Sequence, residues 1–176
     1  MTTHGGSSST IHNTWQAMMQ RCYDINFSAY PWYGGKGVKV CEDWHNFECF
    51  RDWGLANGYK KGLHIDKDIL IPWNKLYCPE ACRFVTPATN SLLTDRRYYR
   101  GELPQGVSKN KGGRYTTTVN FLGKSKHLGT YETIKEASSV YRKNKYEIIL
   151  FHAVLQPTLE LHDALLRHAE LVLKGK

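Results

Sequence analysis

The segment from Gly106 to Phe151 constrains the fold of this 176-residue chain more than any other. Alternating side chains along residues 114–122 are typical of a strand with one buried face. Glycine-containing turns flank it. The expected strands are residues 106–108, 114–122 and 126–131. Thr133 and Glu136 then form a capping box, which begins an amphipathic helix to about Phe151. The segment therefore predicts a three-stranded antiparallel sheet packed on one helix.

The last segment, after Pro157, carries leucines at helical spacing. We expect a C-terminal helix with one apolar face. The face could close the core of the chain, or it could pair two copies as a homodimer. The sequence leaves both open.

The first half carries most of the aromatic residues, which we expect to pack as core. Helical spacing predicts a helix over residues 10–23, and a Gly34–Gly37 turn leads into a short strand. The further elements expected are a helix at 42–54, strands at 63–70 and 82–85, and a helix from Thr86 or Pro87 to about Thr94. The fold class is therefore α+β.

The basic charge of the chain, +8 overall, is unevenly distributed. Residues 96–146 hold twelve Lys or Arg against three Glu. This local excess predicts a nucleic-acid partner for one module. We expect four regions: a flexible start at 1–9, a first domain at 10–95, a second at 96–151, and the C-terminal helix at 152–176.

The five cysteines all lie in the first half, and no secretory signal precedes them. We expect a reducing, cytoplasmic setting with small buried thiols. A structural zinc site built from Cys22, Cys41, Cys82 and a fourth ligand is the alternative. No stretch is apolar enough for a membrane span, so no membrane partner is expected.

Asp66 and Asn90 are the residues that most suggest chemistry. Two strands and a helix should bring Asp66, at a strand end, near Asn90 on the helix. Carboxylate and amide oxygens suit Mg²⁺ or Mn²⁺, which can stabilise charge on a scissile phosphate. The neighbouring Lys67 could orient phosphate, or act as a base if its pKa were strongly lowered. The alternative is that residues 66–68 form a solvated strand end.

Three runs, YGGKGVKVCEDW, LHIDKDIL and YCPEACRFVT followed by Asn90, resemble the phage HNH-type (ββα-metal) homing endonucleases. The resemblance covers residues 15–97. It implies that Asp66 and Asn90 are metal ligands, that Lys67 takes the usual base position and that Arg83 contacts phosphate. It also implies cleavage or nicking of double-stranded DNA in the cytoplasm of a phage-infected bacterium.

Two positions depart from that pattern, because Lys67 replaces the usual His and Ala81 replaces an Asn. A protonated Lys activates water poorly, so His64, Tyr33 or Tyr77 could serve as the base instead. A DNA-binding regulator or inhibitor that no longer cuts is the alternative on the same fold. A protein-binding adaptor using the aromatic first half is a third possibility.

Residues 101–141 resemble the ethylene-response-factor (Apetala-type) DNA-binding domain. The residues that carry the likeness are Gly106, Val107, Arg114, Tyr115, Leu128–Tyr131, Thr133, Glu136, Ala137 and Tyr141. The resemblance implies a sheet laid into the major groove of double-stranded DNA. The expected contacts are Arg97, Arg100, Lys109, Lys111, Arg114, Tyr115, Thr117, Asn120, Lys124 and Lys126.

Overall fold

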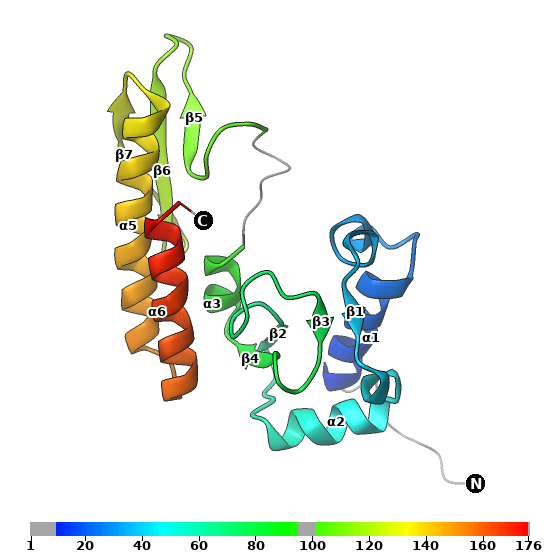
Figure 1. Cartoon of the computed structure of the whole chain (residues 1–176). Coiled ribbons are helices and arrows are strands. Elements are labelled where there is room, and N and C mark those ends of the chain that lie inside the picture. The colour runs from blue at the N-terminus through cyan, green and yellow to red at the C-terminus, as the bar shows by residue number, and fades with distance from the viewer. Residues whose placement is uncertain (1–9, 95–100, 176) are drawn as a thin grey trace, which may run out of the picture. The chain divides into compact units, whose positions relative to one another are not determined.

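The computed structural model describes residues 10–94 and 101–175 of a mixed α+β chain (Figure 1). The chain divides into two compact units, Met1–Asn90 and Ser91–Lys176, which we call unit 1 and unit 2. The expected flexible start at 1–9 and the expected boundary at Asp95 lie outside the described residues. No described helix has the length and apolar character needed to cross a membrane.

Unit 1 consists of short elements. They are α1 (Thr10–Tyr23), the 3-10 turns η1 (Tyr30–Trp32), η2 (Gly34–Lys36) and η3 (Glu42–His45), α2 (Phe47–Ala56), the strands β1 (Lys39–Val40), β2 (His64–Asp66), β3 (Leu76–Tyr77) and β4 (Arg83–Val85), and α3 (Pro87–Leu92), which runs into unit 2. The strands form two separate pairs, β1 with β3 in parallel and β2 with β4 antiparallel.

Aromatic side chains form the core of unit 1, as expected. The Trp44 ring lies 4.4 Å from Trp53 and 5.1 Å from Phe50, measured between ring centroids. Trp44 and Phe50 are fully buried, and so is Met18 of α1. The indole N–H of Trp15 donates to the Trp44 carbonyl at 2.7 Å, which satisfies a polar group inside the cluster. This core holds the short strands in place.

Two expectations for unit 1 are wrong, and side-chain hydrogen bonds explain both. The expected helix at 42–54 is broken at Asn46, whose backbone is extended and whose Oδ1 accepts from the Glu48 N–H to begin α2. The expected strand at 63–70 ends at Asp66, because Asp66 Oδ1 accepts from the N–H groups of Asp68 and Ile69 and turns the chain. Strand β3 was not expected.

Unit 2 confirms the sheet and helices predicted from the sequence. Its elements are β5 (Val107–Lys109), β6 (Tyr115–Phe121), β7 (Lys124–Tyr131), α5 (Ile134–Val154) and α6 (Leu159–Leu173). The strands form one antiparallel sheet in the order β5-β6-β7. The capping box is present, since Thr133 Oγ1 accepts from the Glu136 N–H and the Glu136 carboxylate accepts from the Thr133 N–H.

Helix α5 covers one face of the sheet, and α6 packs alongside α5 (Figure 1). Gly106 permits the close approach of α5, because a Cβ there would lie 2.0 Å from the Tyr141 ring. Four residues of α6 are buried in this packing: Leu161, Ala164, Leu165 and Ala169. Most of the apolar face of α6 is therefore used within unit 2, which favours the first of the two alternatives for this helix.

Candidate functional site

The antiparallel pair β2–β4 and the helix α3 that follows β4 form the candidate site of unit 1. Ile65 and Phe84 are directly opposite and point into the aromatic core, where the Phe84 ring lies 5.5 Å from Trp53. Since side chains alternate along strands, the partners Asp66 and Arg83 lie on the other face together with His64. We call this face the hairpin face.

The hairpin face meets α3 through His64 and Asn90. His64 Nδ1 and Asn90 Nδ2 lie 3.4 Å apart, and the imidazole is exposed while Asn90 is half-buried. The structure thus brings together two predicted site residues that are 26 positions apart in sequence. An exposed imidazole positioned by an amide can exchange a proton with a bound substrate or water.

The Asp66 carboxylate is buried and accepts two backbone hydrogen bonds. It is 7% exposed, and its Oδ1 accepts from the N–H groups of Asp68 at 2.7 Å and Ile69 at 3.0 Å. The carboxylate therefore shapes the loop that follows β2. A carboxylate can accept amide hydrogens and still bind a cation, so metal ligation by Asp66 stays a prediction.

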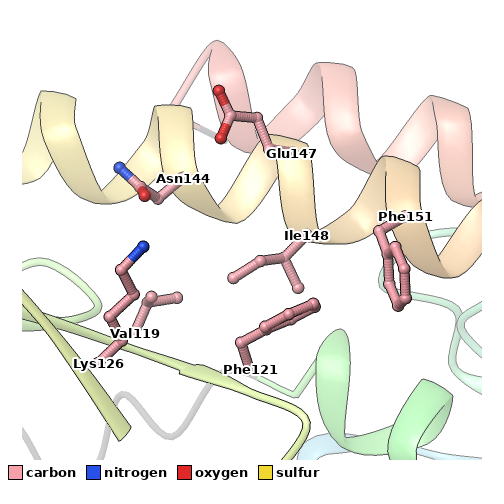
Figure 2. Close-up of a pocket in the computed structure, with 7 residues that line it drawn as sticks. All are labelled: Val119, Phe121, Lys126, Asn144, Glu147, Ile148 and Phe151. Atoms are coloured by element: carbon pink, nitrogen blue, oxygen red, sulfur yellow. The ribbon is translucent and has the colours of Figure 1, made fainter.

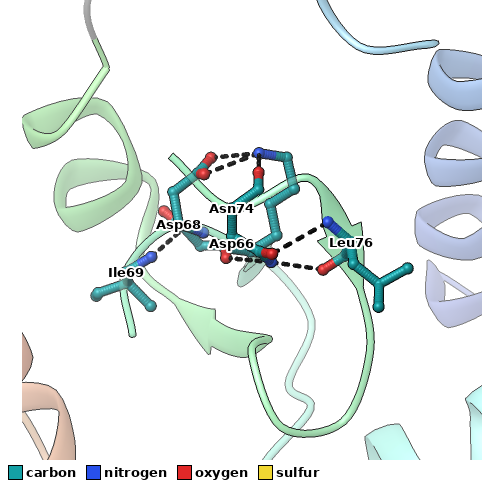
Figure 3. A network of polar contacts seen from close by, with 6 residues as sticks. Asp66, Asp68, Ile69, Asn74 and Leu76 are labelled. Carbon is teal, nitrogen blue, oxygen red and sulfur yellow. Dashed lines mark hydrogen bonds and ion pairs between the residues drawn. The ribbon is translucent and has the colours of Figure 1, made fainter. Parts of the chain in front are cut away.

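The Lys67 ammonium is buried and has structural partners, and its role as a base or phosphate contact stays a prediction. Its ammonium donates to both carboxylate oxygens of Asp68, at 2.8 and 2.7 Å, and to the carbonyl oxygen of Asn74. Figure 3 shows this network of contacts around the loop after β2. All three donor hydrogens of the ammonium therefore have an acceptor in the loop after β2. Lys67 is a structural cation.

Arg83 makes structural hydrogen bonds, and Tyr77 is buried in the core. Arg83 Nη1 donates to the carbonyl oxygens of Pro79 and Cys82, at 2.8 and 2.6 Å, and so holds the turn before β4. Tyr77 is 2% exposed, and burial raises its pKa well above the ordinary value, which excludes it as a substitute base. Among the bases considered, His64 has the most accessible position.

The structural zinc site, which was the alternative for the cysteines, stays untested. Within residues 10–94 and 101–175, no group of three or more His, Cys, Asp or Glu is arranged to hold a metal ion. Burial raises the pKa of the Cys22 thiol to about 11 and that of Cys82 further, so both are protonated near neutral pH. In this state the two buried thiols pack as small apolar side chains.

The open face of the sheet in unit 2, opposite α5, is polar but nearly free of charge. We call it the outer face. The strand register places on it Ser108, Thr116, Thr118, Asn120, Ser125, His127 and Thr130. Most of these side chains are exposed, and each can donate or accept hydrogen bonds. The alternation in residues 114–122 already placed Thr116, Thr118 and Asn120 on one face, but of these only Asn120 was expected to contact DNA.

Several expected DNA contacts lie on the helix side of the sheet instead. Thr117 is fully buried and its hydroxyl donates to the Ala137 carbonyl at 3.1 Å, so a DNA contact through Thr117 is wrong. Tyr115 is half-buried on the same side. Lys126 lies opposite the buried Val119 and lines a shallow pocket of about 210 Å³ between the sheet and α5 (Figure 2). Lys124 pairs with Phe121 in the same register, so it also lies on the helix side of the sheet.

The remaining basic candidates lie at one end of the sheet. Lys109, Lys111 and Arg114 are exposed around the turn between β5 and β6. The Arg114 guanidinium pairs with the Glu132 carboxylate at 2.9 Å, which offsets part of its charge. Arg97 and Arg100 lie outside the described residues. The basic character of this end is therefore carried by the last residue of β5, Lys109, and by the turn that follows it.

No known protein family, curated protein or solved structure matches this chain. Function is accordingly inferred from the residues themselves. Two groups of side chains support such an inference: the hairpin face with Asn90 in unit 1, and the outer face with its basic loop in unit 2.

Proposed function

We propose that this chain is a divalent-metal-dependent DNA endonuclease of the HNH (ββα-metal) class, guided to double-stranded DNA by unit 2. The observation that carries the proposal is the contact between His64 and Asn90 across the β2–β4–α3 arrangement. Strand β2 pairs with β4 and α3 follows β4, which is the order of the ββα-metal pattern with β3 in the connection between the two strands. The residue types on the shared face are those that phosphodiester hydrolysis requires.

In this proposal His64, rather than Lys67, is the general base that removes a proton from the attacking water. For this role Nε2 of His64 must carry the free lone pair, so Nδ1 is protonated and donates to the Asn90 amide oxygen, with the amide turned from the orientation in which Nδ2 faces Nδ1. The Asp66 carboxylate and the Asn90 amide oxygen are the oxygen ligands for Mg²⁺ or Mn²⁺, which would stabilise negative charge on the leaving oxygen. Arg83 holds the turn that positions Asp66 across the strand pair.

Unit 2 supplies the DNA contacts in this proposal. The outer face enters the major groove, where hydroxyl, amide and imidazole groups can pair with base edges. Lys109, Lys111 and Arg114 contact the flanking phosphates, so binding weakens steeply as salt rises. The likeness to phage homing nucleases would place this activity in the cytoplasm of an infected bacterium.

A second candidate is a DNA-binding protein on the same fold that does not cut. The observation that favours it is the engagement of Asp66 and Lys67, whose charged groups hold the loop after β2. Such a chain would regulate or block a DNA site. Unit 2 would perform the whole of that function, and the hairpin face would only support the fold.

Supercoiled plasmid with Mg²⁺ or Mn²⁺ separates the two candidates. The wild-type chain is expected to convert it to the nicked or linear form, and His64→Ala to lower the rate about 100-fold or more. Asn90→Ala should impair cleavage similarly. His45→Ala is the matched control, since it removes another exposed imidazole of unit 1 and should leave cleavage unchanged. Binding of duplex DNA with intact plasmid in both metals would establish the second candidate instead.

A further inference from the structure

The loop after β2, together with the first residue of β3, exposes large apolar side chains. Ile71, Trp73 and Leu76 are 50%, 67% and 40% exposed, whereas Trp44 in the core is 1% exposed. Neighbouring apolar side chains left in water on one loop indicate a contact surface. A tryptophan is the largest such side chain, and it presents a flat aromatic face.

Trp73 also has an unfavourable backbone conformation, with φ at 60°. This left-handed region suits glycine and is rare for bulky residues, because the Cβ approaches the following carbonyl. A folded chain retains such strain where the surrounding contacts impose it, and strained residues of this kind gather at binding sites. The conformation turns the indole outward rather than into the core.

The neighbouring Asn74 is held by several hydrogen bonds. Lys67 Nζ donates to the Asn74 carbonyl oxygen, and Asn74 Nδ2 donates back to the Lys67 carbonyl at 3.0 Å. The Leu76 N–H donates to Asn74 Oδ1 at 3.1 Å (Figure 3). The buried Lys67 therefore fixes the loop one residue after Trp73 and presents the indole from a rigid support.

Positive charge borders the loop. The Lys39 N–H donates to the Lys75 carbonyl at 2.9 Å, so these two exposed lysines are neighbours on β1 and at the start of β3. Lys36 lies a few residues before β1, with its ammonium 4.9 Å from the centre of the Trp32 ring. Aromatic faces beside lysines are suited to nucleic acid, since bases stack on the rings and phosphates pair with the cations.

We propose that Trp73 contacts the bases of DNA held at the hairpin face, while Lys39 and Lys75 contact the flanking phosphates. This inference rests on the proposed function, since it concerns the DNA of the same site. The indole either inserts between base pairs of a duplex or stacks on an unpaired base, and both use its flat apolar surface. Trp73 is thus a positioning contact outside the chemical step.

The test measures binding of the full chain to a fluorescein-labelled 20-base-pair duplex of mixed sequence and to one of its single strands, by anisotropy in EDTA. Trp73→Gly is expected to raise the dissociation constant about ten-fold on at least one of the two probes. The same change should raise the melting temperature of unit 1 by about 4 °C, because glycine relieves the left-handed strain. Trp73→Phe should retain most of the affinity.

Ile25→Gly is the matched control, because Ile25 is 72% exposed in unit 1 and lies outside this loop. It should leave both dissociation constants unchanged. Lys39→Gln and Lys75→Gln should each reduce the salt dependence of duplex binding by about one unit of slope. EDTA prevents metal-dependent cleavage, so this assay is independent of nuclease turnover.

Two results would overturn the inference alone. The first is wild-type affinity of Trp73→Gly for both probes. The second is a melting temperature that falls together with affinity, since that would make the indole a structural group. Failure of the wild-type chain to bind either probe would overturn the inference and DNA binding together, whereas binding without plasmid cleavage would remove only the nuclease activity.

Discussion

Units 1 and 2 each bury a lysine, and they surround it differently. Lys67 is 7% exposed, and its ammonium has both Asp68 oxygens and the Asn74 carbonyl as acceptors. Lys145 of α5 is 8% exposed, and burial alone lowers its pKa to about 8, with no described carboxylate opposing the shift. One buried charge is compensated and the other is not.

The difference follows from the regularity of the two units. The strands of unit 1 have two or three residues, so the loop after β2 depends on side-chain hydrogen bonds for its shape. Unit 2 has strands of seven and eight residues and a helix of 21, whose backbones satisfy their own polar groups. The shape of unit 1 therefore depends on the hydrogen bonds of its buried lysine, whereas the fold of unit 2 does not depend on Lys145.

The largest expected effect is that of Lys67→Met. The change leaves the Asn74 carbonyl and the Asp68 carboxylate without their donor, and should lower the free energy of unfolding of unit 1 by about 3 kcal/mol. Tryptophan fluorescence in a denaturant titration reports unit 1 selectively, because all five tryptophans lie before residue 90. Lys60→Met, at an exposed position, should leave the midpoint in place; equal midpoints for Lys67→Met and wild type would refute the structural role.

The second effect should have the opposite sign. Lys145→Met removes an uncompensated buried charge and should stabilise unit 2 by about 2 kcal/mol at pH 7. Circular dichroism at 222 nm follows α5 and α6 during denaturation. Lys143→Met is the matched control, since Lys143 is an exposed neighbour on the same helix. Destabilisation by Lys145→Met would mean that the ammonium has a compensating partner.

The pH dependence of unit 2 provides a separate check on Lys145. Its pKa is lowered from 10.5 to about 8, so between these values the unfolded chain binds more protons than the folded one. Stability should therefore rise from about pH 8 to about pH 10.5 and level off below pH 8. Lys145→Met should remove this slope. Burial, and then the charge of Lys145, also lowers the pKa of the nearby His152, an effect confined to lower pH.

The same contrast explains what the sequence could predict. The strands and helices of unit 2 were predictable because their signals are local, as in the alternation around Val119 and the capping box at Thr133. In unit 1 the short strand β3 depends on contacts specific to the folded chain, whereas the break at Asn46 is a local N-cap that the aromatic spacing of residues 42–54 concealed. Parallel pairing of β3 with β1 joins residues 37 positions apart, such as Lys39 and Leu76.

Part of the candidate site could likewise be predicted from the sequence, and part could not. The residue types and spacing pointed to Asp66, Asn90 and His64, and the fold brings His64 to Asn90. The structural contacts of Lys67 could not be predicted, because one of its acceptors is the backbone carbonyl of Asn74, whose position no side-chain pattern reveals. Thr117 was expected to contact DNA because its side chain is polar. The alternation that places it on the same face as Val119 already indicated that it is buried.

The smallest effect tests a feature that both units share. Each has a helix that begins with a side-chain cap, Asn46 for α2 and Thr133 for α5, and each cap accepts a backbone N–H of the first turn. Because capping is local, Asn46→Ala and Thr133→Ala should cost about 1 kcal/mol each, with the same sign. Glycine at either position should cost only about a few tenths of a kcal/mol, since it removes the cap but suits the extended backbone.

Tryptophan fluorescence measures the loss for the α2 cap, and circular dichroism measures the loss for the α5 cap. A cost at Asn46 several times that at Thr133 would show that the caps of unit 1, like its buried lysine, hold tertiary structure beyond their own helix.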